Sequence, residues 1–316
     1  MRIPMPEERH ERGCGIACLV AVAAALLSGA VGARVPARGQ PPIYLGVLAP
    51  VFVDGGADQV QALRVRVAFR FLDGRWEAMP FRATDIQPTQ GVRDQYPAAL
   101  VWTVVFDGRS LGEIRTTRPP SAVRALDSAW VAVMDLIPGS KPPLVEGGAR
   151  SFETWNGPLR VRPLVVVSQP NYVDPDQWKP SQPAPGLLAQ GRAAFHKAID
   201  LRLDCGANPT SVYPDEFVQF VRAYRSSRGD ALLAFRADPE KNHCYFNYDE
   251  WDSVWFYVRN GEFHLLGTGL TLIDEGDYDG DGTSEVILQK SGYNRDGYVL
   301  VHLPDASTKT FIWSYH

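Results

Sequence analysis

Residues Arg64–Phe71 read Arg-Val-Arg-Val-Ala-Phe-Arg-Phe, so apolar side chains alternate with positions that are mostly arginine. A period of two residues is typical of a β-strand that has one face in a core and the other in water. Asp73-Gly74 follows, and then the short run Arg75–Met79. An Asp-Gly pair between two such runs is the strongest short signal for a β-hairpin. This stretch therefore predicts an antiparallel hairpin.

The same arrangement of two runs around a tight turn recurs further along the chain. Asp-Gly and Asn-Gly favour the left-handed backbone of the turns that join hairpin strands. The further hairpins are Val101–Phe106 with Leu111–Arg115 around Asp107-Gly108, and Val254–Arg259 with Glu262–Leu266 around Asn260-Gly261. Consecutive hairpins form antiparallel meanders, whereas parallel strands need long crossovers. We therefore expect a mainly β fold of antiparallel meanders.

Few segments favour a helix. Ser121–Val133 has room for a helical turn or two, and Leu187–Ile199 has the composition of a short helix. The apolar residues of Phe217–Tyr224 match a helical stripe, but Tyr224–Ala231 also fits the tip of a hairpin. Both interpretations of this element stay open, with a slight preference for the hairpin.

Residues 1–33 have the features of a secretory signal peptide. Ile16–Leu27 is an unbroken run of apolar and small residues that follows two arginines, and Ala30–Ala33 offers a small-x-small cleavage site. The run is shorter than the roughly 20 residues that a membrane-spanning helix needs. A cleaved signal is therefore favoured over an uncleaved anchor, and we expect an exported protein of bacterial type, periplasmic or extracellular.

Cleavage of the signal would leave two cysteines, Cys205 and Cys244. An even pair in a chain that matures in an oxidising compartment predicts a disulfide. The alternative is two buried free thiols.

A proline-rich stretch divides the chain. Six prolines lie between positions 163 and 185, among Ser, Gln, Asn and Asp. Proline cannot donate a hydrogen bond to a sheet and disfavours helical geometry in the residue before it. We expect an N-terminal β domain over residues 41–162, a connector over residues 163–190, and a C-terminal β domain over residues 191–316.

The formal net charge is −4. Nucleic-acid binding requires a concentrated basic face, and anionic membranes attract polybasic runs; the sequence has neither. We expect no nucleic-acid partner and no transmembrane segment after signal cleavage. An extracellular protein or glycan is a possible ligand.

Residues Gly276–Leu288 read Gly-Asp-Tyr-Asp-Gly-Asp-Gly-Thr-Ser-Glu-Val-Ile-Leu. The three aspartates, at alternate positions, direct carboxylate oxygens to one side of a tight turn, and oxygen ligands at this charge density suit calcium. Without a cation the three charges would repel one another. The alternative is a solvated Asp-Gly turn that binds no metal.

Spacing excludes one type of calcium loop. An EF-hand needs a bidentate Glu at position twelve, where this loop has Leu288. Glu285, at position nine, can close the site instead, and the β run Val286–Leu288 replaces the helix that would follow an EF-hand loop.

Gly-Asp-x-Asp-Gly-Asp-Gly, followed by an acid and a β-strand, resembles the FG-GAP or VCBS repeat, the calcium loop of integrin-type β-propeller blades. The resemblance covers about Val254–Val301, in a single copy. It implies a C-terminal β region like a propeller blade and a structural calcium ion. The ligands it implies are the side chains of Asp277, Asp279, Asp281 and Glu285 and the backbone carbonyl of Thr283; the final acid is usually Asp in the family.

No GxSxG, SxxK or HExxH signature occurs in the chain, so the common hydrolase and metalloprotease motifs are missing. We therefore favour a non-enzymatic protein with a binding or structural role. The alternative is a secreted hydrolase, for example one that acts on carbohydrate, with its site in the acidic and aromatic loops around Trp251, where Asp249, Glu250 and Asp252 lie.

Two further motifs have an ordinary structural interpretation. Arg228-Gly229-Asp230 spells an integrin-recognition tripeptide, but it lies where a hairpin turn requires Gly and Asp. Seven aromatic residues between positions 155 and 255 could stack on sugars if exposed, yet a buried β core is the favoured interpretation. They are Trp155, Trp178, Trp251, Trp255, Tyr172, Tyr245 and Tyr248.

Overall fold

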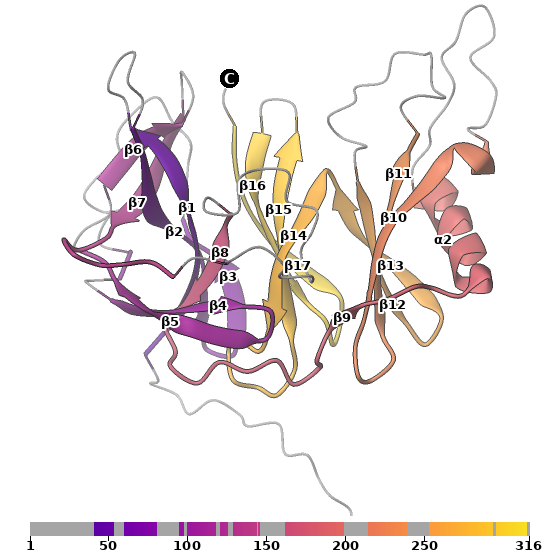
Figure 1. The fold of residues 1–316 in the computed structure, drawn as a ribbon, viewed down its shortest axis with the longest axis horizontal. Helices are drawn as coiled ribbons and strands as arrows, with labels where there is room; N and C mark the ends of the chain where they lie inside the picture. The colour runs from indigo at the N-terminus through magenta and orange to yellow at the C-terminus, as the bar shows by residue number, and fades with distance from the viewer. Residues whose placement is uncertain are drawn as a thin grey trace, which may run out of the picture. The chain divides into compact units, whose positions relative to one another are not determined.

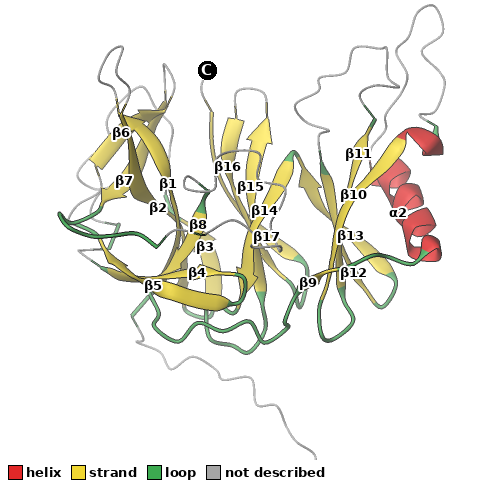
Figure 2. Cartoon of the chain, viewed as in Figure 1, coloured by secondary structure: helices red, strands yellow, loops and turns green. Residues whose placement is uncertain are grey.

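A computed structural model describes residues 41–53, 60–80, 95–97, 100–117, 121–125, 129–143, 145, 162–198, 214–238, 253–292 and 295–314. Within these ranges the chain is mainly β, and its strands form three antiparallel sheets (Figure 1). One α-helix accompanies them in the described part of the chain (Figure 2). The predicted class, mainly β with antiparallel meanders and few helices, is confirmed.

The N-terminal sheet has the strand order β5-β4-β8-β1-β2-β7-β6, and β3 pairs with β2. Its centre is therefore built from strands that are far apart in the sequence, because β8 lies between β4 and β1. The strands are β1 (Ile43–Val53), β2 (Val60–Leu72), β3 (Arg75–Ala78), β4 (Val101–Phe106), β5 (Arg109–Arg115), β6 (Ser121–Ala125), β7 (Ala129–Asp135) and β8 (Leu164–Val167).

The other two sheets are built almost entirely from neighbouring strands. The second has the order β13-β12-β11-β10-β9, and the third has the order β14-β15-β16-β17. Their strands are β9 (Lys179–Pro180), β10 (Val218–Arg225), β11 (Ala231–Ala237), β12 (Val254–Arg259), β13 (Glu262–Thr268), β14 (Leu270–Gly276), β15 (Glu285–Gly292), β16 (Arg295–His302) and β17 (Ser307–Ser314). Each sheet thus contains a four-stranded meander.

The predicted hairpins form at the predicted turns. Asp73-Gly74, Asp107-Gly108 and Asn260-Gly261 all have positive φ at both positions, which is the signature of a type I′ turn. They join β2 to β3, β4 to β5, and β12 to β13. Turn chemistry therefore sets the local pairing in each case.

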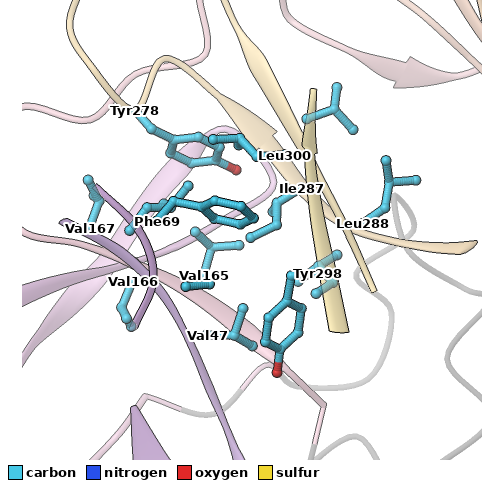
Figure 3. Packing of buried hydrophobic residues seen from close by; sticks show 14 of the residues in the cluster. Val47, Phe69, Val165, Val166, Val167, Tyr278, Ile287, Leu288, Tyr298 and Leu300 are labelled. Carbon is cyan, nitrogen blue, oxygen red and sulfur yellow. The ribbon is translucent and has the colours of Figure 1, made fainter. Parts of the chain in front are cut away.

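One cluster of buried apolar side chains draws its members from all three sheets. Figure 3 shows part of it, with Val47, Phe69 and Val165 of the N-terminal sheet near Ile287 and Tyr298 of the last sheet. Stacked rings extend the packing, since the rings of Tyr298 and Phe311 lie 6.5 Å apart at an interplanar angle of 11°. The three sheets therefore share apolar packing.

A second cluster lies under the helix α2 (Pro185–Ala198). Phe195 of the helix is fully buried with Phe235 and Phe256 of the sheet below it. A Cβ added at Gly191 would overlap the ring of Phe235, so this glycine permits the close approach of helix and sheet.

The remaining secondary-structure predictions have mixed outcomes. The helix predicted at Leu187–Ile199 is confirmed by α2, and the hairpin interpretation of Phe217–Ala231 is confirmed by the pairing of β10 with β11. The helical turn predicted within Ser121–Val133 is wrong, because this segment forms β6 and part of β7, which pair with each other. Pairing of β7 with β2, across Arg64–Asp135, outweighs the local preference.

The predicted connector, residues 163–190, contains more regular structure than its prolines indicate. Strand β8 lies within it and pairs with both β1 and β4. The boundaries of the N-terminal and C-terminal β domains remain predictions. No helix among the described residues has the length and apolar character that crossing a membrane requires.

Candidate metal centre

The aspartate-rich loop joins β14 to β15. Gly276 at the end of β14 pairs directly with Glu285 at the start of β15, so the chain leaves and re-enters the sheet at one point. Gly280 and Gly282 have φ values of +81° and +90°, a backbone conformation that residues other than glycine rarely adopt. These two glycines allow the eight residues between the paired positions to fold back on themselves.

Three of the predicted ligands converge in this loop. Asp277, Asp279 and Glu285 each offer one carboxylate oxygen, and these oxygens all lie within 4.8 Å of one another. Asp277 and Glu285 are 4% and 0% exposed. Among the described residues this is the one grouping of His, Cys, Asp and Glu side chains with metal-ligand spacing.

Backbone amides hold the Asp277 carboxylate in place. Its Oδ1 accepts hydrogen bonds from the amides of Gly280 (2.6 Å) and Asp281 (3.1 Å), and its Oδ2 accepts one from Gly282 (2.9 Å). An aspartate that binds amides three to five residues ahead folds the chain around its own side chain. Asp277 thus shapes the loop as well as contributing charge.

Glu285 closes the loop from its other end. Its Oε2 accepts a hydrogen bond from the amide of Tyr278 at 3.0 Å, whereas its buried Oε1 has no hydrogen-bond partner in the described part of the chain. An unpaired buried carboxylate oxygen is costly unless another group, such as a cation, satisfies it. The free oxygen belongs to the same side chain that completes the three-carboxylate cluster.

The electrostatics of the cluster favour either a proton or a cation. Burial, together with the neighbouring Asp281 and Asp277 carboxylates, raises the pKa of Asp279 to about 7. Burial also raises the pKa of Glu285 well above its usual range, with Asp279 as the next cause. Three ionised carboxylates are therefore unfavourable here without a positive charge between them.

Asp281 and Thr283, the other two predicted ligands, make contacts of their own. Asp281 Oδ1 accepts hydrogen bonds from the Thr283 amide (2.7 Å) and from the Thr283 hydroxyl (2.6 Å). The second carboxylate oxygen of Asp281 lies 3.9 Å from Nε2 of His302. The structure brings Asp281 beside the cluster without including it in the group of three.

A pair of buried acids precedes the loop, and sequence reasoning did not identify it. Asp274 and Glu275 on β14 are 0% and 1% exposed. Asp274 accepts hydrogen bonds from the hydroxyls of Tyr172 and Tyr278 (both 3.3 Å) and from the Asp107 amide (2.9 Å). Burial raises the pKa of Asp274 to about 7. Asp274 therefore joins β14 to the β4–β5 turn and to the two tyrosines.

The alternative site at Trp251, with Asp249, Glu250 and Asp252, lies outside the described residues, as do Cys205 and Cys244 and the signal region. Of the aromatic residues considered as a sugar platform, Tyr172, Trp178 and Trp255 are 7%, 4% and 1% exposed, so these three belong to the core. The others, Trp155, Trp251, Tyr245 and Tyr248, are outside the described ranges.

The Arg228-Gly229-Asp230 tripeptide is a hairpin turn between β10 and β11, as predicted. Its two charged side chains contact the protein itself. Asp230 accepts a hydrogen bond from the Tyr257 hydroxyl at 2.7 Å, and Arg228 donates to the carbonyl of Gly282 in the aspartate-rich loop at 3.0 Å. The tripeptide is therefore part of the fold around the candidate metal centre.

Neither a protein-family model, nor a curated protein, nor a solved structure matches this chain.

Proposed function

We propose that this protein is an exported, non-enzymatic calcium-binding β protein with a binding or structural role. In this proposal Asp277, Asp279 and Glu285 hold a calcium ion that stabilises the loop between β14 and β15. The observation that carries the proposal is the convergence of three carboxylates, two of them buried, within 4.8 Å in one loop.

The cost of leaving the cluster without a cation is a sizeable fraction of the stability of a typical domain, which is about 5–15 kcal/mol. Two like charges at this separation repel by about 3–4 kcal/mol at the effective dielectric constant of a protein surface. A divalent ion at the centre converts this repulsion into attraction and gives the unpaired Glu285 Oε1 a partner. Ion binding therefore relieves two unfavourable features at once.

The donor set favours a hard cation. All three side chains offer oxygen, whereas zinc and copper sites are built mostly from nitrogen and sulfur donors. Magnesium demands near-ideal octahedral geometry, while calcium takes six to eight oxygen ligands in flexible arrangements. The irregular loop between β14 and β15 therefore suits calcium better.

The resemblance to the FG-GAP or VCBS repeat supports the same ion. The strands that flank the loop belong to a four-stranded antiparallel meander, β14 to β17, which is the connectivity of a propeller blade. Asp281 and the Thr283 carbonyl are then further candidate ligands, and recruiting Asp281 would require its carboxylate to turn from the Thr283 hydroxyl toward the cluster. The signal peptide, periplasmic or extracellular location, and a Cys205–Cys244 disulfide complete the proposal.

Calcium titration of the purified mature protein by isothermal calorimetry tests the proposal. We expect saturable binding of one ion in the wild type and its loss in Asp279→Asn, which keeps the shape of the side chain but removes its charge. Asp73→Asn, in the β2–β3 turn, is the matched control and should bind as the wild type does. Zinc and magnesium titrations test the choice of ion, and absence of calcium binding at millimolar concentration would refute the proposed function.

A further inference from the structure

The segment Gln169–Trp178, which follows β8, runs alongside the aspartate-rich loop. Val173 forms an isolated antiparallel bridge with Asp277, whose amide donates to the Val173 carbonyl at 2.9 Å. The Gln169 side-chain amide donates to the Asp277 carbonyl at 3.1 Å. This segment, about a hundred residues earlier in the chain, therefore supports the first candidate ligand.

Two aspartates of the same segment hold Ser284, the residue before the ligand Glu285. Asp174 Oδ1 accepts a hydrogen bond from the Ser284 hydroxyl at 2.9 Å, and Asp176 Oδ2 accepts one from the Ser284 amide at 3.0 Å. Ser284 is fully buried. With its amide and its hydroxyl both fixed, Ser284 sets the position from which the Glu285 side chain enters the cluster.

The turn between β10 and β11 reaches the same point from a third part of the chain. Arg228 Nε lies 2.6 Å from Asp176 Oδ1, and Arg228 Nη2 donates to the Gly282 carbonyl at 3.0 Å. The Ser227 amide donates to the Asp176 carbonyl at 2.7 Å. Arg228 thus contacts both the segment and the loop, and the buried Asp176 carboxylate accepts a hydrogen bond from the Ser284 amide and forms an ion pair with the Arg228 guanidinium.

We infer that Arg228 and Asp176 are positioning residues for the calcium site, and that calcium in turn holds the β10–β11 turn against the loop. This inference rests on the proposed calcium function. Arg228 neutralises Asp176, Asp176 orients Ser284, and Ser284 places Glu285, so a change at Arg228 acts on the ion through three contacts. Because coupling between two sites is reciprocal, an ion that favours the closed loop also favours the docked turn.

The test compares calcium affinity in variants that leave every candidate ligand intact. Arg228→Met removes both contacts, and Arg225→Met removes an exposed arginine three positions earlier that makes no ion pair among the described residues. Outer contacts of metal ligands are typically worth a factor of about 10–100 in affinity. We expect Arg228→Met and Asp176→Asn each to weaken calcium binding about 10-fold or more, and Arg225→Met to leave it unchanged.

A double variant separates a shared pathway from two independent effects. If Arg228 acts through Asp176, Arg228→Met combined with Asp176→Asn should bind calcium no more weakly than the worse single variant. Losses that multiply would overturn the route from Arg228 through Asp176, because they would assign the effect of Arg228 to its separate contact with the Gly282 carbonyl. If Arg228→Met fails to fold, the comparison of Asp176→Asn with the Arg225→Met control is the test. Wild-type calcium affinity in Asp176→Asn would then overturn the inference.

Hydrogen exchange measures the reciprocal effect. Calcium should slow exchange of the Ser227 and Asp230 amides in the wild type and have no effect on them in Asp279→Asn. The inference would be overturned if Arg228→Met bound calcium with wild-type affinity, or if calcium did not change the exchange rates of the Ser227 and Asp230 amides in the wild type. Neither result would contradict the calcium site itself. A wild type that binds no calcium would instead refute the proposed function, and the inference with it.

Discussion

Replacing Asp279 by Asn should raise the stability of the protein in chelator and lower it in calcium. The Asn side chain keeps an oxygen that can accept the hydrogen bond from the Asp281 amide, now 3.1 Å from Asp279 Oδ1. It removes one of three converging negative charges. The metal-free protein should therefore become more stable, whereas the calcium-bound protein should lose its ion and become less stable than the wild type.

The magnitude in chelator follows from the pKa of Asp279. A rise from 3.8 to about 7 corresponds to about 4 kcal/mol at 1.36 kcal/mol per pKa unit, and screening by solvent reduces this to about 2 kcal/mol for a partly exposed side chain. Since the folded pKa is raised, the group favours folding most below pH about 4, and this contribution is lost as pH rises toward 7. The gain from Asn should therefore be present at pH 7.5 and absent at pH 4.

The magnitude in calcium follows from mass action. An ion at a free concentration 100 times its dissociation constant stabilises the folded state by about 2.7 kcal/mol, and the variant should lose this contribution. After the gain of about 2 kcal/mol from the removed charge, the variant in calcium should be less stable than the wild type by about 0.7 kcal/mol. Urea unfolding at pH 7.5, with chelator and with saturating calcium, measures both differences on the same two proteins. Equal destabilisation in the two conditions would refute the electrostatic reasoning, because it would show that Asp279 acts only through packing.

Further predictions concern the surroundings of the site and the core. Gly276→Ala should destabilise the protein by about 2 kcal/mol or more in urea unfolding, because the new Cβ would overlap the ring of Tyr172, whereas Gly186→Ala, in open space, should cost nothing. Asp274→Ala should cost about 2–4 kcal/mol by the same assay, because the Tyr278 hydroxyl and the Asp107 amide lose their acceptor, whereas the Tyr172 hydroxyl keeps the Glu275 carbonyl; Asp274→Asn should cost less. Phe235→Ala should cost about 3–5 kcal/mol and weaken the docking of α2, which loss of helical circular dichroism at lower urea concentration would report.

The hairpins were predictable because their information is local. Asp107-Gly108 and Asn260-Gly261 specify a turn whose backbone matches the twist of the flanking strands, whatever the rest of the chain does. Ser121–Val133 was not predictable in this way, because its strands are specified by partners: β7 pairs with β2, about seventy residues earlier. A segment rich in alanine takes the conformation that such pairing demands.

The candidate site likewise combines residues specified by local sequence with residues that only the tertiary fold brings together. The carboxylates of Asp277, Asp279 and Glu285 lie within nine residues, and their spacing alone predicted that they would meet. Asp176 and Arg228 lie 108 residues before Ser284 and 54 residues before Gly282, respectively, so only the tertiary fold brings them to the loop. No local pattern marks either residue as part of the site, and the tripeptide that contains Arg228 indicates only a hairpin turn.

The place of β8 between β4 and β1 determines when the N-terminal sheet can be completed. Both neighbours pair with β8, and the Tyr44 amide binds the Ser168 hydroxyl across 124 positions of sequence. Until the chain through Ser168 has emerged during synthesis, the inner edges of β1 and β4 lack a partner, and unpaired edges invite association between chains. The two C-terminal meanders, whose contacts are mostly local, can form quickly once they are made. Within the N-terminal sheet, β1 and β4 therefore have to wait for β8 before their pairing is complete.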